Sequence, residues 1–248
     1  MENILRIFPT LTILENDLVK TLNYRNPRYL GDPINAIKLF NNKNVDEICI
    51  LDISSRFSKN HKEINYQLLQ EMAQEAFVPL SYGGNVLTSS IAEKIINLGF
   101  EKIIVNSLLF EDSSEVHRIV QKLGSQSVVL KVDYIIKDGF FHVSYNQRKS
   151  TMKLSYEELI KLIESSCVGE VIFSRTDLDG NMTHYDYKPL KLLLKKLNMP
   201  LVLCHGAKDK SSIIEANKEG FFNFTASSMY VYYGDLKGIL INDPFFHL

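Results

Sequence analysis

The sequence has no tryptophan, only three cysteines and almost no net charge, and each shortage argues against a class of protein. Lys and Arg number 28 against 29 Asp and Glu, and this net charge of −1 argues against a general nucleic-acid or membrane-surface binder. No apolar run reaches the roughly 18 residues that a membrane span needs. The cysteines stand singly in or beside apolar runs, which favours reduced core thiols over a disulfide or zinc framework: Cys49, Cys167 and Cys204.

Targeting and metal-binding patterns are also missing. The first residues, MENILRIF, lack the basic, apolar and small-residue regions of a signal peptide. The six histidines are scattered and show no metal-ligand spacing. We therefore expect a cytoplasmic protein that uses no metal ion and no cofactor.

Short apolar, β-branched runs alternate with amphipathic stretches along the whole chain. In stretches such as 90–100 and 113–124, apolar residues recur at i, i+3, i+4 and i+7, which predicts helices. Strands that alternate with helices pair in parallel through right-handed crossovers. Eight strands in 248 residues are typical of the α/β class of (β/α)₈ barrel, the TIM barrel. A doubly wound open sheet is the alternative, although no GxGxxG turn follows the first strand. The predicted strands are 4–8, 47–53, 78–81, 102–106, 127–133, 170–174, 200–204 and 222–226.

No low-complexity linker and no shift in composition divides the chain, so we predict a single domain over 1–248. The stretch 132–151 is typical of a small hairpin inserted after the fifth strand. The end of the chain, YYGDLKGILINDPFFHL, is too short and too broken by Gly and Pro for a full closing helix.

An internal repeat runs through the chain at an offset of about 121 residues. GFFNFTASSMYV at 220–231 has the same outline as GFEKIIVNSLLF at 99–110. The offset persists at several strand ends, which predicts two similar half-barrels, roughly 1–123 and 124–248. The residues related by it, within one position, are Thr12 and Asp133, Gly84 and Gly206, and Ser107 and Ser228.

The repeated residues suggest two phosphate sites on opposite sides of the barrel mouth. Active sites of such barrels lie at the carboxyl ends of the strands. Glycine and small hydroxyl residues there let backbone N–H groups approach a phosphate. One half would contribute YGGN and VNS, and the other HGA and TASS. Such a pair of sites suits a long substrate with a phosphate at each end.

These motifs together resemble the cyclase subunit of imidazole glycerol phosphate synthase, a barrel that works beside a glutaminase. The blocks DEICILDI and TDLDGNMTHYD are the most specific, and the resemblance extends from Arg6 to about Tyr232. It implies that ammonia from the glutaminase (HisH-like) enters at the N-terminal face, through a gate of four charges. All four match here: Arg6, Glu47, Lys102 and Glu170.

At the opposite face the resemblance implies two catalytic aspartates, at the ends of the first and fifth strands. The fifth-strand residue is present as Asp133, but the first-strand position is Thr12. Threonine cannot hold or supply a proton as a carboxylate does. The phosphate-contact positions implied by the resemblance remain in part: Gly83, Gly84, Asn106, Ser107, Asp179, Gly180, Gly206, Ser227 and Ser228.

A complete gate with an incomplete pair of acids indicates a diverged paralogue. The resemblance then implies a subunit that passes ammonia from the glutaminase for amidation of a sugar in bacterial surface glycans, beside a separate sugar amidotransferase. The alternative is an active cyclase of histidine biosynthesis, in which Thr12 is tolerated or another residue, such as Asp52 or Asp177, replaces the missing acid. The isomerase of the same pathway is a third reading, disfavoured because it also needs the first-strand aspartate.

Overall fold

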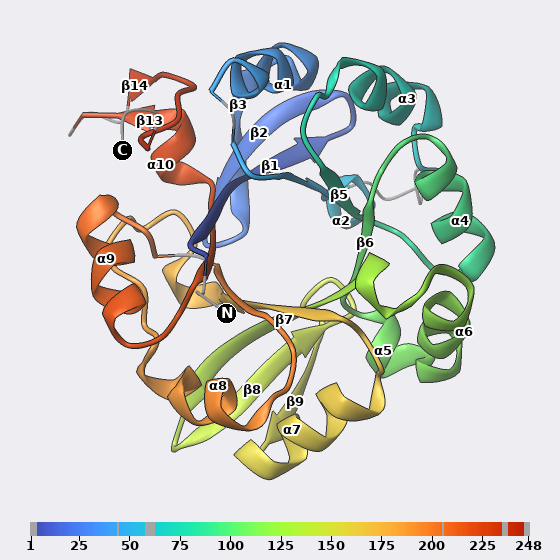
Figure 1. The fold of residues 1–248 in the computed structure, drawn as a ribbon, viewed down its shortest axis with the longest axis vertical. Coiled ribbons are helices and arrows are strands. Elements are labelled where there is room, and N and C mark those ends of the chain that lie inside the picture. The colour runs from blue at the N-terminus through green and yellow to red at the C-terminus, as the bar shows by residue number, and fades with distance from the viewer. Residues whose placement is uncertain (1–3, 44, 58–62, 205, 235–237, 246–248) are drawn as a thin grey trace.

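Eight parallel strands form a closed barrel in the computed structural model (Figure 1), which describes residues 4–43, 45–57, 63–204, 206–234 and 238–245. Each strand pairs with the next, and the ring closes through the pairs β12–β1 and β7–β10. The predicted TIM barrel is therefore confirmed. The barrel strands are β1 (Arg6–Leu14), β4 (Ile48–Asp52), β5 (Leu80–Gly83), β6 (Lys102–Val105), β7 (Val128–Lys137), β10 (Glu170–Arg175), β11 (Leu201–Cys204) and β12 (Asn223–Ala226).

Helices surround the barrel and connect its strands (Figure 1). Their ends follow local sequence signals: α7 begins with a capping box in which Ser155 and Glu158 exchange hydrogen bonds. The helices are α1 (Pro33–Asn41), α2 (Ser54–Phe57), α3 (Tyr66–Glu75), α4 (Ser89–Asn97), α5 (Leu108–Glu111), α6 (Ser113–Leu123), α7 (Tyr156–Ser165), α8 (Lys191–Lys196), α9 (Lys210–Lys218) and α10 (Ser228–Val231), with 3₁₀ turns at Ser125–Ser127, Thr176–Leu178 and Lys188–Leu190. Within the described residues, no helix is long and apolar enough to cross a membrane.

Two antiparallel hairpins extend from the carboxyl ends of barrel strands. The hairpin predicted after the fifth strand is present as the end of β7, β8 (Phe140–Tyr145) and β9 (Ser150–Leu154). A second hairpin, β2 (Asp17–Leu22) and β3 (Arg25–Gly31), follows β1 and was not predicted. The sequence gives no clear signal for it, because Pro and three basic residues interrupt the apolar alternation over 17–31.

The chain end also agrees with expectation. After α10 the described residues form only two short strands, β13 (Tyr232–Tyr233) and β14 (Gly238–Ile239), and no closing helix. The repeat places equivalent residues at equivalent strand ends: Ser107 lies between β6 and α5, and Ser228 begins α10 after β12. The division into half-barrels stays a prediction.

The inside of the barrel is layered along its axis, because residues i and i+2 of a strand point to the same face. Buried apolar side chains fill a middle layer: Phe8, Cys49, Ile104, Val129, Ile172, Val202 and Cys204. Two residues before four of these stand the four predicted gate charges. A separate and larger core packs the outer faces of the strands against the helices.

Candidate functional sites at the two ends of the barrel

The four predicted gate residues form one closed ring of ion pairs at the N-terminal end of the barrel. The Arg6 guanidinium lies 2.5 Å from a carboxylate oxygen of Glu170 and 3.4 Å from one of Glu47. The Lys102 ammonium lies 2.9 Å from Glu47 and 3.0 Å from Glu170. Each charge therefore contacts both charges of opposite sign, and the ring is neutral.

The ring is well shielded from water. Glu47 and Glu170 are buried, and the side chains of Arg6 and Lys102 are 23% and 19% exposed. Burial lowers the pKa of Arg6, but the charges of Glu170 and Glu47 outweigh this and hold its pKa above the ordinary value. The Arg6 guanidinium also lies 4.8 Å from the centre of the Phe8 ring, so the charge ring directly adjoins the apolar layer.

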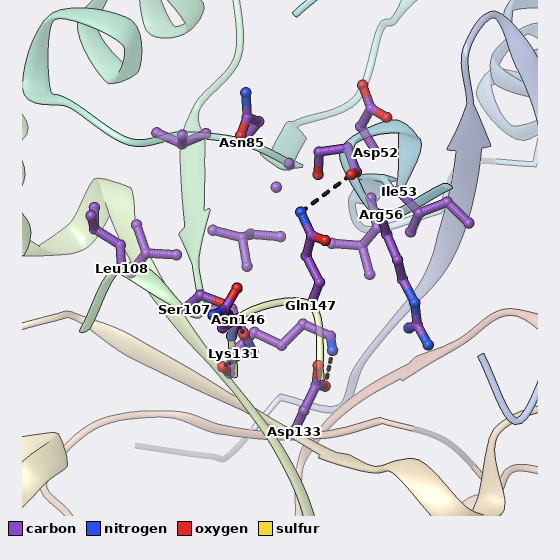
Figure 2. A pocket seen from close by; sticks show the side chains of 18 of the residues that line it. Asp52, Ile53, Arg56, Asn85, Ser107, Leu108, Lys131, Asp133, Asn146 and Gln147 are labelled. Carbon is purple, nitrogen blue, oxygen red and sulfur yellow. Dashed lines mark hydrogen bonds and ion pairs between the residues drawn. The ribbon is translucent and has the colours of Figure 1, made fainter. Parts of the chain in front are cut away.

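At the opposite end, a buried ion pair occupies the centre of the barrel mouth. Lys131 lies two residues before Asp133 on β7, so both side chains point inward, and their charged groups are in direct contact (Figure 2). The Lys131 ammonium also lies 3.2 Å from the Ser174 hydroxyl. Asp133, the aspartate predicted to be catalytic, is thus paired with a lysine that sequence reasoning missed.

Tyr24, from the turn of the β2–β3 hairpin, covers this ion pair. Its hydroxyl lies 3.3 Å from both the Lys131 ammonium and an Asp133 oxygen, and 2.7 Å from the Ser174 hydroxyl. Burial, followed by the charges of Asp133 and Asp179, raises the pKa of the Tyr24 phenol well above its ordinary value. The phenol is therefore a neutral hydrogen-bonding group rather than a base.

The mouth is divided into a larger and a smaller cavity, which share Tyr24, Leu51, Ile53 and Arg56. The larger one holds about 440 Å³ and includes Asp133, whereas the smaller one holds about 30 Å³ and includes Thr12. The two positions expected to carry the cyclase chemistry thus line different cavities. A volume of about 30 Å³ is room for little more than one water molecule.

Four of the predicted phosphate-contact residues line the larger cavity, where β5 and β6 end: Gly83, Gly84, Asn106 and Ser107. Gly84 has φ of 150°, and a Cβ there would lie 2.7 Å from the backbone oxygen of Asp52. The Ser107 hydroxyl accepts a hydrogen bond of 2.7 Å from the backbone N–H of Asn146, at the tip of the β8–β9 hairpin. The hairpin tip therefore closes over this subsite.

The predicted contacts from the second half are arranged differently. Asp179 and Ser227 line the smaller cavity, and Gly180, Gly206 and Ser228 line neither of the two cavities. The Asp179 carboxylate is engaged by the β2–β3 hairpin: it lies 2.7 Å from the Lys20 ammonium and accepts hydrogen bonds from the Thr21 hydroxyl and the Tyr24 backbone. Lys20 is buried and was also missed from the sequence.

The two alternative acids lie in contrasting surroundings. Asp52 lines the larger cavity; burial raises its pKa, and it accepts hydrogen bonds from the Ser54 backbone and the Tyr82 hydroxyl. Asp177 instead forms a 2.7 Å ion pair with Arg175. In the described part of the chain, no three His, Cys, Asp or Glu side chains are grouped so that they could hold a metal ion.

The sequence of this chain is similar to one group of known proteins. A family model described as histidine biosynthesis protein matches residues 6–237. At 37% identity over 243 residues, the chain is similar to a Leptospira borgpetersenii protein provisionally named imidazole glycerol phosphate synthase subunit HisF, with 96% of this chain and 94% of that protein covered.

Two further relatives show the same relationship. A Pseudomonas aeruginosa protein, provisionally named imidazole glycerol phosphate synthase subunit hisF2, is 36% identical over 96% of this chain and 95% of its own length. The imidazole glycerol phosphate synthase subunit HisF of a Hydrogenobaculum species is 30% identical over 86% of this chain and 84% of its own length.

Proposed function

Since the chain belongs to the histidine biosynthesis protein family, among the HisF-like cyclase subunits of imidazole glycerol phosphate synthase, we propose that it is an ammonia-conducting barrel subunit. It receives ammonia from a glutaminase at the N-terminal face. The ammonia leaves at the mouth, where a sugar for bacterial surface glycans is amidated with the help of a separate sugar amidotransferase.

The closed charge ring is the observation that carries this proposal. Four paired charges exclude bulk water and ions, yet one side chain needs only to swing aside for a small neutral molecule to pass. Behind the ring lies a layer of buried apolar side chains, from Phe8 to Cys204. Such a layer favours neutral ammonia over the ammonium ion, because a buried charge without a partner is strongly unfavourable.

The mouth supports a role other than cyclisation. General acid–base chemistry by two carboxylates needs both groups in one site and free to exchange protons. Here Thr12 stands in place of one of the two carboxylates, and the carboxylate of Asp133 forms an ion pair with Lys131. The walls of the larger cavity instead carry neutral amide and hydroxyl groups, which suit the hydroxyl groups of a sugar: Asn85, Asn106, Ser107, Asn146 and Gln147.

Exposed apolar side chains near the ring support docking of the glutaminase there. Ile4, just before β1, is 84% exposed, and Phe77, in the loop before β5, is 85% exposed. Both lie at the N-terminal ends of barrel strands, on the same face as the ring. Aromatic and aliphatic anchors of this kind commonly carry much of the binding energy of an interface.

The proposal is tested by reconstitution with the glutaminase and amidotransferase encoded beside this chain. We expect the glutaminase to co-purify with the barrel and cross-link to residues at the N-terminal face, and glutamine to support formation of an amidated sugar. Cross-links confined to the loops after the strands, or product formation that is indifferent to the barrel, would overturn the proposal.

An active histidine-pathway cyclase is the second candidate, and one observation favours it. Asp52 lies in the same cavity as Asp133, and its raised pKa suits a proton donor better than an ordinary aspartate would. A cyclase assay on the barrel with ammonia and the ribulosyl substrate of that pathway decides between the two, as does a neighbouring set of histidine or glycan genes.

A further inference from the structure

Two arginines flank one aromatic ring at the edge of the larger cavity. The Arg148 guanidinium lies 4.7 Å from the centre of the Tyr24 ring, and that of Arg56 lies 5.4 Å from it. Arg56 comes from α2, after β4, whereas Arg148 comes from the tip of the β8–β9 hairpin. Figure 2 shows Arg56 extending along the cavity beside the Lys131–Asp133 pair. Residues 92 positions apart thus bring two like charges together.

Neither guanidinium is in direct contact with a counter-charge in the described part of the chain. No carboxylate there forms an ion pair with Arg56 or Arg148, although both line the cavity. Arg148 donates only to a neutral group, the Thr176 hydroxyl, at 3.1 Å. Burial, and then the charge of Arg148, lowers the pKa of Arg56, and the charges of Asp133 and Asp179 offset this only in part. Two half-buried like charges without an ion-pair partner are unfavourable unless an anion joins them.

The acidic side chains of the cavity do not supply that anion. Asp133 contacts the Lys131 ammonium, and Asp52 accepts its hydrogen bonds from Ser54 and Tyr82. Glu111, the third acid of the lining, is exposed. The lining also includes Lys149, but that side chain is exposed, so the two guanidiniums are the half-buried cations of the cavity for which the described residues provide no ion pair.

The backbone conformation and hydrogen bonds of the hairpin tip fix the position of Arg148. Asn146, Gln147 and Arg148 all have positive φ, at 50°, 55° and 66°, a conformation that non-glycine residues rarely adopt in succession. The tip is fastened on two sides, by the Asn146 N–H to Ser107 and by the Gln147 amide to the Ser55 backbone oxygen at 3.2 Å. Figure 2 shows Gln147 reaching across the cavity to make the second contact.

We propose that Arg56 and Arg148 together bind the single anionic group, a phosphate or a carboxylate, of a compact polyhydroxylated ligand. The rest of the ligand lies in the cavity of about 440 Å³ among the neutral amide groups, a volume within the range of small-molecule sites. One anion is expected rather than two, because the opposite side of the mouth offers only about 30 Å³ and its Lys20 is already paired with Asp179. The inference rests on the proposed function in taking this ligand as the sugar that awaits ammonia.

Binding to the full-length barrel alone, measured by calorimetry, tests the inference. The probes are ribose 5-phosphate, glucuronate, neutral ribose and ribulose 1,5-bisphosphate. We expect an anionic monosaccharide to bind at least about tenfold more tightly than ribose, since a hydrogen bond to a charged group is worth one decade or more in affinity. The first two probes tell a phosphate site from a carboxylate site. The bisphosphate should bind no more tightly than the better of the two.

Matched variants assign the binding to the arginine pair. Arg148→Ala and Arg56→Ala should each weaken binding of the anionic probe at least about tenfold, whereas Lys153→Ala, an exposed cation on β9 of the same hairpin, should leave it unchanged. Thermal unfolding of each variant checks that it is folded. If Arg148→Ala does not fold, Arg148→Lys, which keeps the charge, is measured in its place.

Three results would overturn the inference: equal binding of ribose and its phosphate, unchanged binding in the folded arginine variants, or a bisphosphate that binds tenfold more tightly. Because the assay contains no glutaminase, its failure leaves the docking and ammonia experiments untouched, and their failure leaves this result untouched.

Discussion

At the N-terminal end of the barrel, four charges from four strand starts satisfy one another, whereas at the mouth two guanidiniums meet across Tyr24 without a described carboxylate partner. The ring is complete without any other molecule. The mouth combines internal ion pairs, Lys131–Asp133 and Lys20–Asp179, with two arginines that form no ion pair with the described residues. Under the proposed function, the N-terminal end is a self-contained barrier and the mouth is a site that a ligand completes.

The same contrast separates this chain from a two-acid cyclase. The charge ring keeps every group that the family resemblance implies, while the mouth has Thr12 in place of one acid and Lys131 against the other. Selection on ammonia passage alone would keep the first and release the second. The predictions that follow test this difference at each end of the barrel.

Cyclase activity is where the largest effect is expected. Given ammonia and the ribulosyl substrate of the histidine pathway, the barrel should turn over at least about a thousandfold below a typical enzyme rate of about 10 s⁻¹, because removing one member of a cooperating catalytic set costs several orders of magnitude. Product formation is followed beside an authentic histidine-pathway cyclase as positive control. A rate near that of the control would refute the contrast and favour the second candidate function.

The buried pairs differ in what they contribute to stability. Lys131→Ala should lower the free energy of unfolding by about 3 kcal/mol, because it leaves Asp133 buried beside Tyr24 without its cation. Lys102→Ala should lower it by only about 1 kcal/mol, because Arg6 still contacts both glutamates of the ring.

Urea denaturation measures both values, with Lys153→Ala as the exposed control. Equal losses in the two variants would mean that Arg6 does not compensate for the lost lysine of the ring, and the comparison between the two ends would have to be withdrawn.

Two substitutions, one before β5 and one after it, test which face of the barrel binds the glutaminase. Phe77→Ala, before β5, should weaken the glutaminase complex about tenfold, as truncation of a well-packed aromatic anchor commonly does. Leu87→Ala, in the loop after β5, removes a 44% exposed apolar side chain from the opposite face and should change nothing. If Leu87→Ala were the more damaging change, the glutaminase would dock at the mouth.

Thiol labelling tests whether the apolar layer between the charge ring and the mouth is closed to water, and it is the smallest of the expected effects. Burial raises the pKa of both Cys49 and Cys204 to about 12, so neither forms an appreciable amount of thiolate at neutral pH. In the folded protein, iodoacetamide should therefore modify Cys167, which is exposed, and leave the other two intact. Rapid labelling of Cys49 would mean that water reaches the layer.

Much of the fold could be predicted because strands buried on both faces are continuous apolar runs, as in EICILDI and SVVLKVD. The four ring charges are predicted by the family resemblance and not by their position alone, because charges at strand starts usually just face water. Lys131 left a signal that was overlooked: a charge in an apolar strand, two positions before Asp133, must share its inward face.

The rest of the mouth gave no comparable local signal. Arg56 and Arg148 belong to a one-turn helix and a hairpin tip, and only the closure of the barrel brings them to one aromatic ring. Tyr24 reaches them from a hairpin whose sequence alternation is interrupted by basic residues. Contacts of this kind depend on long-range geometry, which neither propensity nor spacing encodes.

Ammonia coupling tests the central claim most directly. With glutaminase, barrel and amidotransferase combined, the ratio of amidated product formed to glutamate released is measured for the unaltered barrel, Lys102→Ala and Glu47→Ala, with Lys153→Ala as control. A ring that gates ammonia predicts that both ring variants still support glutamine hydrolysis but lower this ratio, while the control keeps it. An unchanged ratio in both ring variants would mean that the four charges only close the end of the barrel, and the account of ammonia conduction would be wrong.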